Sequence, residues 1–143
     1  MNYNKKLDKI GLAIYHTGIE INGSEYAYGG NALLDSSGVY EMRPKKHDVF
    51  LFRQSIEVKD LKLESMEVVY KVLPGIMKKF KANKYNMLRF NCNHFSDEFL
   101  RKISKDKHRL PAYLNRPANI GGKVHCLIPI RYLIVIPPGT SED

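Results

Sequence analysis

Cys92 is the residue of this chain best suited to nucleophilic chemistry. Apolar residues recur at every fourth position after it: Phe95, Phe99 and Ile103. This spacing predicts an amphipathic helix over about 92–103, with the cap-type residues Asn91 and Asn93 at its start and the acids Asp97 and Glu98 in its early turns. A thiol at the start of a helix meets the positive end of the dipole and unpaired N–H groups, which favour thiolate and could bind an oxyanion. We therefore expect a lowered pKa for Cys92.

A cysteine nucleophile needs a base, and the chain has five histidines. His16 ends the apolar run Ile10–His16, just before Thr17-Gly18, where a buried strand could hold an imidazole at a cleft. Catalytic Cys and His are usually distant in sequence and adjacent in the fold. The pattern favours a pair of His16 and Cys92, and it leaves open that they are two unrelated half-buried residues. The other histidines suit other roles: capping or packing for His94, solvated positions for His47 and His108, and no evident chemistry for His125.

Metal binding is the weaker interpretation of the same residues. Cys92-x-His94 and His125-Cys126 together offer four potential ligands, but neither spacing matches known zinc fingers or knuckles. The chain also carries no glycine-rich phosphate loop and no evident carboxylate pair. We expect no metal and no cofactor.

The whole chain has the composition of an ordinary globular protein. Its 143 residues are 43% hydrophobic and 27% charged, enough for a real core. Its two cysteines, Cys92 and Cys126, do not make a disulfide scaffold. No apolar signal core follows Met1, so we expect a reducing compartment, the cytoplasm with the nucleus as a second location.

The formal net charge of +8 is concentrated in one stretch. Residues 78–109 hold ten Lys and Arg against three acids, a net of +7. A solvated lysine-rich surface is the expected interpretation, since no aromatic recognition motif interleaves these charges, and we expect no nucleic acid as partner. The apolar stretch 126–136 is too short for a membrane span, which needs roughly 20 residues.

Turn signals divide the N-terminal half into short antiparallel strands. Asn22-Gly23 predicts a tight hairpin between strands 19–21 and 24–28. Further strands are expected at 39–42 and 49–53. Helical spacing follows from Met66 to Met77, where Pro74-Gly75 should end or kink the helix. A short helix or turn is expected over 110–115, so the fold class is α+β.

Two separated motifs resemble the PPPDE family, which includes deSUMOylating isopeptidases and related deubiquitinases. They are His16-Thr17-Gly18-Ile19-Glu20 with its continuation to Gly30, and Asn91-Cys92-Asn93-His94-Phe95-Ser96. Shorter matches surround them, at 37–41, 52–56 and 110–116. The resemblance covers about residues 10–122, which suggests a catalytic domain over 1–122 and a partly docked tail over 123–143.

This resemblance implies a circularly permuted papain-like fold, with an antiparallel sheet or small barrel packed against helices that include the nucleophile helix. The family's catalytic histidine falls on His16 and its nucleophile on Cys92. The implied reaction is cleavage of an isopeptide or peptide bond at the C-terminal glycine of ubiquitin or a ubiquitin-like modifier such as SUMO. No Asp or Asn is identifiable as a third member that orients His16.

Two other functions fit the same residues. A protein S-acyl thioesterase could use the same Cys–His pair, since some family members are associated with removal of acyl chains from cysteine. A non-catalytic module that binds ubiquitin-like proteins is the other alternative, although the presence of both His16 and Cys92 counts against it.

Overall fold

The computed structural model of the protein describes residues 15–31, 35–47, 52–59, 61 and 65–115. The first regular feature among these residues is the hairpin of β1 (Ile19–Ile21) and β2 (Ser24–Tyr28), paired antiparallel. The two turn residues have positive φ, 51° at Asn22 and 80° at Gly23, as a turn that matches strand twist requires. The predicted hairpin is confirmed.

In the described part of the chain, β3 (Val39–Met42) is the third strand of a sheet with the order β1-β2-β3. It pairs antiparallel with β2, with Tyr28 opposite Val39. Gly38 permits this pairing, because a Cβ there would lie 2.3 Å from the carbonyl oxygen of Gly29. The strand predicted at 39–42 is confirmed.

Two further strand predictions fall partly or wholly outside the described residues. Of the run Ile10–His16 only Tyr15 and His16 are described, and of 49–53 only Phe52 and Arg53 are described. None of these four residues is in a strand, so for them the prediction was wrong. His16 therefore lies on the irregular segment that leads into β1.

α2 (Ser65–Lys79) continues past Pro74, where the sequence predicts an end or a kink. Pro74 removes one N–H donor from the helix, and the carbonyl that loses its bond is that of Tyr70. Tyr70 and Pro74 are exposed, so water can hydrate this carbonyl, while Ile76 on the other face is fully buried. Of the two predicted outcomes at Pro74-Gly75, an end or a kink, the end of the helix was wrong, because buried packing extends beyond the proline.

Three helical elements follow: η1 (Ala82–Lys84), α3 (Cys92–Ile103) and η2 (Ala112–Asn115). α3 has the bounds that its apolar spacing predicts, and η2 confirms the short helix expected over 110–115. Asp97 lies beyond the first turn of α3. Its carboxylate accepts a hydrogen bond from the backbone N–H of Leu110 at 2.8 Å instead of interacting with the positive end of the helix dipole.

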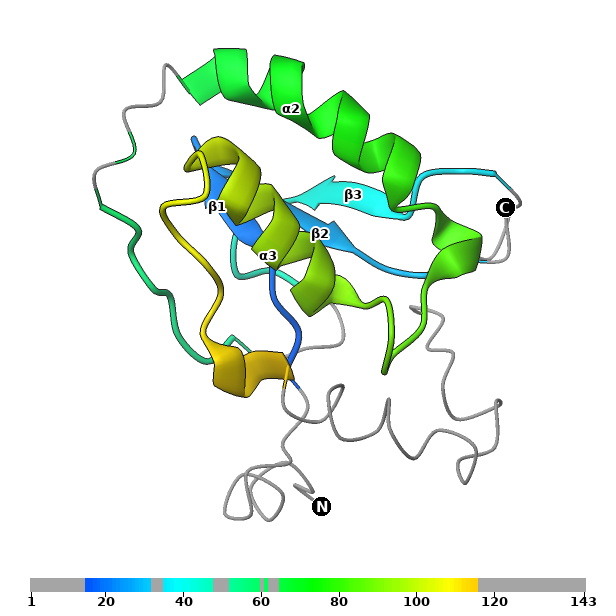
Figure 1. Ribbon diagram of the computed structural model, residues 1–143. Helices are drawn as coiled ribbons and strands as arrows, with labels where there is room; N and C mark the ends of the chain where they lie inside the picture. The colour runs from blue at the N-terminus through cyan, green and yellow to red at the C-terminus, as the bar shows by residue number, and fades with distance from the viewer. Residues whose placement is uncertain (1–14, 32–34, 48–51, 60, 62–64, 116–143) are drawn as a thin grey trace.

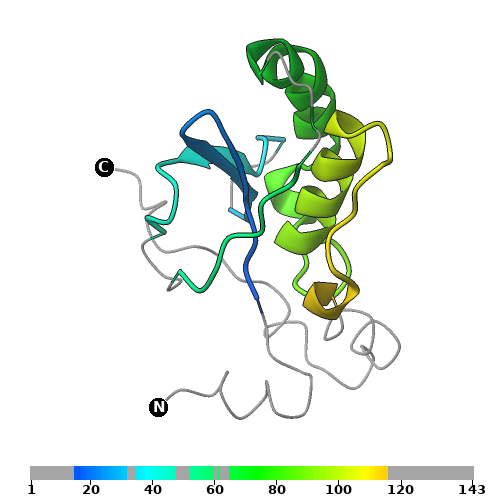
Figure 2. The same cartoon turned by 90° about the vertical axis from the view of Figure 1, so that its left-hand side faces the viewer.

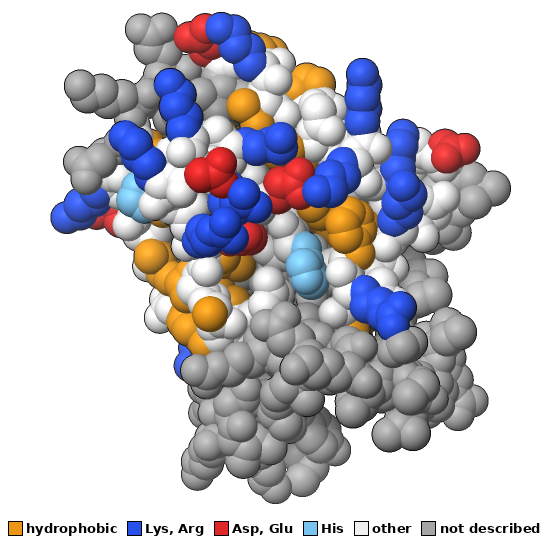
Figure 3. Space-filling model, viewed as in Figure 1, with side chains coloured by type: hydrophobic (Ala, Val, Ile, Leu, Met, Phe, Trp, Pro, Cys, Tyr) orange, Lys and Arg blue, Asp and Glu red, His pale blue; other side chains and the backbone are white. Residues whose placement is uncertain are grey.

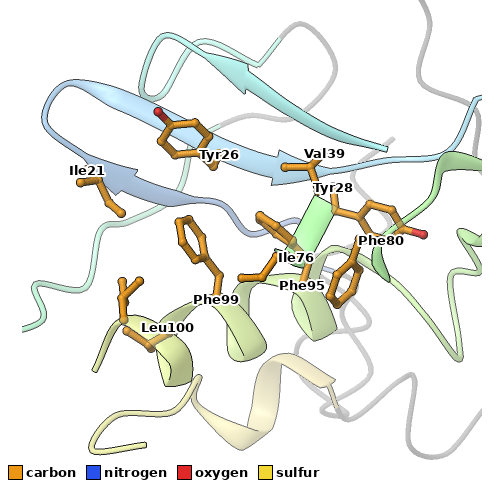
Figure 4. Packing of buried hydrophobic residues seen from close by; sticks show 10 residues of the cluster. Ile21, Tyr26, Tyr28, Val39, Ile76, Phe80, Phe95, Phe99 and Leu100 are labelled. Atoms are coloured by element: carbon orange, nitrogen blue, oxygen red, sulfur yellow. The ribbon is translucent and has the colours of Figure 1, made fainter. Parts of the chain in front are cut away.

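The sheet forms one layer, and both long helices cover the same face of it (Figures 1 and 2). α3 packs directly on β1 and β2, and α2 packs beside α3. Four aromatic side chains at the centre are at most 1% exposed: Tyr28, Phe80, Phe95 and Phe99 (Figure 4). Each such side chain contributes on the order of 2–3 kcal/mol by burial, so this cluster fixes α3 against the sheet.

The surface over the helices carries the basic patch of residues 78–109, with acids interspersed among the Lys and Arg side chains (Figure 3). Two ion pairs lie within it, Lys79 with Glu98 and Arg101 with Asp106. Among the described residues, no helix combines the length and apolar character that crossing a membrane requires.

Candidate active site

Cys92 is the first residue of α3, and the turn that precedes it is closed by a capping box. The side-chain oxygen of Asn91 accepts the backbone N–H groups of Asn93 at 3.0 Å and His94 at 3.1 Å. In return, Nδ1 of His94 lies 3.2 Å from the backbone nitrogen of Asn91. His94 is therefore a capping residue, as expected, and it holds the start of the helix that carries the thiol.

The segment 15–17 lies across the buried thiol of Cys92. The Cys92 Sγ is 3.9 Å from the carbonyl oxygen of Tyr15, and the Thr17 backbone N–H also faces the sulfur. The residues on either side of His16 thus both contact Cys92. The structure brings the chain at His16 to the thiol from 76 positions away in sequence.

Asn93 holds this segment in place. Its amide nitrogen donates to the carbonyl oxygens of Tyr15 at 3.2 Å and Leu114 at 3.0 Å. Its amide oxygen accepts the Thr17 hydroxyl at 2.9 Å, and the same hydroxyl lies 2.9 Å from the Ser96 hydroxyl. Asn93 is 4% exposed, so these bonds form in the interior, where unmade ones would be costly. It was expected as a cap, but it joins α3 to the His16 segment and to η2.

The His16 ring packs against two groups that follow in the sequence. The hydroxyl of Tyr40 lies 3.5 Å from Nε2 of His16 and 3.1 Å from Nε2 of His47. The two imidazole rings are 4.8 Å apart between centroids. His47 was expected to be solvated, and this was wrong: it is half-buried and lies beside His16. The spacing of residues in the sequence does not predict the position of His47, because that position depends on the chain reversal at Lys45 (φ 64°).

Burial governs the protonation of both candidate residues. Burial raises the pKa of the Cys92 thiol, outweighing the N–H of Thr17, the Tyr85 hydroxyl and the first-turn N–H groups, which favour thiolate. The expected lowering of this pKa was therefore wrong. Burial, and after it the neighbouring His47, lowers the pKa of His16 from 6.5 to about 4. At pH 7 the site holds a neutral thiol and a neutral imidazole.

Tyr85 is a site residue that the sequence did not reveal. Its hydroxyl contacts the Cys92 sulfur, and burial is the main cause that raises the pKa of this phenol. Gly30 makes room for it, because a Cβ at Gly30 would lie 2.9 Å from the Cβ of Tyr85. The absence of a side chain at Gly30 therefore allows Tyr85 to reach the thiol.

The geometry gives little support to the alternative of a metal site. His94 is engaged in the helix cap, and His125-Cys126 falls outside the described residues. Within the described part of the chain, no three His, Cys, Asp or Glu side chains are grouped so that they could hold a metal ion.

The chain matches one family model over residues 2–132, described as "PPPDE putative peptidase domain". It is 34% identical to the "Desumoylating isopeptidase 1 homolog" of Caenorhabditis elegans, over 98% of this chain and 43% of that protein. It is 30% identical to a DeSI-like protein of Arabidopsis thaliana, over 88% of this chain and 54% of the relative. A DeSI-like protein of Schizosaccharomyces pombe is 32% identical over 82% of this chain and 58% of that protein.

The chain thus spans about half the length of these relatives. The family match, in contrast, covers nearly the whole chain, including both motifs. The chain belongs to the PPPDE family.

Proposed function

We propose that this protein is a cysteine isopeptidase that removes ubiquitin or a ubiquitin-like modifier, with SUMO as the first candidate, from lysine side chains. Cys92 is the nucleophile and His16 the base. The observation that carries the proposal is the contact of the Cys92 thiol with the segment around His16, at 3.9 Å from the Tyr15 carbonyl oxygen. The similarity to a desumoylating isopeptidase homolog of C. elegans supports the substrate class.

The reaction proceeds through an acyl-enzyme. His16 accepts the thiol proton as the sulfur attacks the carbonyl carbon of the modifier's C-terminal glycine, which forms the S–C bond. The tetrahedral intermediate collapses, the C–N bond breaks, and His16 returns the proton to the departing lysine amine. Water, deprotonated by His16, then hydrolyses the thioester and releases the modifier's carboxylate. His16 is neutral at pH 7 and can therefore serve as the acceptor, although a pKa of about 4 makes it a weaker base than an ordinary histidine.

The oxyanion needs donors, and the first turn of α3 offers fewer than a bare helix end would. The N–H groups of Asn93 and His94 already donate to Asn91. The donors that remain beside the sulfur are the backbone N–H groups of Cys92 and Thr17 and the hydroxyl of Tyr85, and we assign the Cys92 N–H and the Tyr85 hydroxyl to the oxyanion.

Burial of the nucleophile limits what can reach it. Cys92 is only 5% exposed, and Tyr85 and Thr17 lie against its sulfur. A substrate chain without side chains fits such an approach best, because only glycine lets a backbone come so close. The di-glycine end of ubiquitin-like modifiers has this property.

The proposed order of the site, with the histidine before the cysteine, is also that of a circularly permuted papain-like fold. The sheet that follows His16 and the helix that begins at Cys92 fit this fold. We propose this architecture for the family domain of the chain.

The test is a panel of ubiquitin and SUMO proteins that carry a C-terminal electrophile. Purified protein should form a covalent adduct with at least one of them, and Cys92→Ala should form none, although Cys126 is still present. An adduct that survives Cys92→Ala, or no adduct with wild type, would refute the protease and favour a binding module. Cleavage of an acyl-thioester reporter without cleavage of isopeptide-linked conjugates would instead identify a thioesterase.

A further inference from the structure

The hydroxyl of Tyr40 lies between the imidazoles of His16 and His47. It can donate a hydrogen bond to only one of them and can accept one from the other. A phenol carries one proton and can donate it to one acceptor only. Nε2 of His47 is the nearer nitrogen, at 3.1 Å, and Nε2 of His16 is at 3.5 Å. The shorter contact favours donation of the Tyr40 proton to His47, which leaves the Tyr40 oxygen as an acceptor toward His16.

From this geometry we infer that Tyr40, held by His47, is a positioning residue that fixes His16 as the Nε2–H tautomer and leaves Nδ1 as the basic nitrogen. The inference rests on the proposed function, in which His16 is the base. It supplies the third member that the sequence lacks, with a phenol in place of a carboxylate or amide. Apo contacts of this kind are often long and shorten in the reactive complex.

The position of His47 is built into the fold. The turn that carries it is tied to β2, because the backbone N–H of Lys45 donates to the Glu25 carboxylate at 3.0 Å. Tyr40 itself is on β3, paired opposite Ala27 of β2. Both members of the Tyr40–His47 pair are thus fixed relative to the same sheet, which can hold the His16 ring in one orientation.

The Tyr40 oxygen also favours the charged form of His16 that arises during the reaction, against burial and the neighbouring His47, which both lower the pKa of His16. When Nδ1 takes the thiol proton, the Nε2–H of the imidazolium donates to the Tyr40 oxygen, and the Tyr40 proton stays on its bond to His47. No net proton leaves the site. The titratable groups that the structure describes around the Tyr40 hydroxyl are those of His16, His47, Cys92, Glu25 and Tyr85.

The direct test is the ring ¹⁵N spectrum of histidine-labelled wild-type protein at pH 7, assigned with a His16→Gln variant. His16 should have its proton on Nε2 and His47 on Nδ1. A His16 ring protonated on Nδ1 would overturn the inference. This readout needs no substrate, so it stands apart from the failure or success of the isopeptidase assay.

A second test compares Tyr40→Phe with Tyr26→Phe, a matched loss of one phenol hydroxyl from the neighbouring strand. Tyr40→Phe should mix the His16 tautomers and lower the rate of Cys92 alkylation at pH 7 by about tenfold, read at the Cys92 peptide by mass spectrometry. It should lower kcat by a similar factor with little change in KM. Tyr26→Phe should do neither. An unchanged tautomer and alkylation rate in Tyr40→Phe would refute the positioning role.

Discussion

The side-chain amide of Asn93 donates to the carbonyl oxygen of Tyr15 at 3.2 Å, across 78 positions of sequence. This bond joins the residue after the proposed nucleophile to the residue before the proposed base. Because Thr17 closes a second bond to the same amide, the backbone on both sides of His16 is fixed to α3. The geometry of the site thus depends on Asn93 as much as on the two reactive residues.

Replacement of Asn93 by Ala should destabilise the fold and the site together. It leaves the carbonyl oxygens of Tyr15 and Leu114 without their shared donor, at a cost of about 2–4 kcal/mol in the free energy of unfolding. Denaturant unfolding measures this loss. Asn83→Ala, at an exposed position of η1, is the control and should stay within about 0.5 kcal/mol of wild type. Equal stability of the two variants would show that the Asn93 bonds do not hold the segment.

Two glycine-to-alanine substitutions should change the free energy of unfolding in opposite directions. Gly75 lies inside α2 with nothing within 4 Å of an added Cβ, so Gly75→Ala should stabilise the protein by about 0.5–1 kcal/mol. Gly38→Ala should destabilise it by at least about 2 kcal/mol, because its Cβ would strike the Gly29 carbonyl and the Tyr28 ring. Thermal unfolding of both variants checks the pair. A destabilised Gly75→Ala would contradict a continuous helix through Pro74.

Local patterns were enough to predict the hairpin and the nucleophile helix. The turn Asn22-Gly23 determines its own φ values, and the four-residue spacing of Phe95, Phe99 and Ile103 determines the buried face of α3. The cap at Asn91 is local as well. These elements can be predicted from the sequence because the residues that define them lie within a few positions of one another.

The errors arise where distant segments meet. α2 continues past Pro74 because Ile76 packs in the core, and no residue near the proline in the sequence predicts this packing. His47 reaches His16 through a turn fixed by Glu25. The helix dipole at Cys92 was visible in the sequence, but the burial that outweighs it depends on the segment 15–17 and on Tyr85.

The folded state should lose stability in mildly acidic solution through His16. Its pKa is lowered from 6.5 to about 4 in the folded protein, so between these values the unfolded chain binds more protons. The contribution is complete above pH 6.5 and falls as the pH drops toward 4, by at most about 3 kcal/mol. Unfolding free energies measured across this range should show a smaller slope in His16→Gln. The same slope in both proteins would mean that His16 titrates normally.

The thiol of Cys92 should react slowly at neutral pH in the absence of substrate. Burial raises its pKa above the ordinary value of 9.0, so the thiolate fraction at pH 7 is below that of a free cysteine. Alkylation of the Cys92 peptide by iodoacetamide should keep rising beyond pH 9. Urea-unfolded protein is the control, and its midpoint should be lower. A plateau below pH 8 in the folded protein would show a preformed thiolate instead.

Rapid-quench mass spectrometry during cleavage of an isopeptide-linked SUMO or ubiquitin conjugate tests directly whether Cys92 is the nucleophile. The cysteine mechanism predicts a transient thioester between the modifier's C-terminal glycine and Cys92, absent in Cys92→Ala. It also predicts that His16→Gln slows its formation by at least about 100-fold. Cleavage that persists in Cys92→Ala, or that is unchanged in His16→Gln, would contradict it.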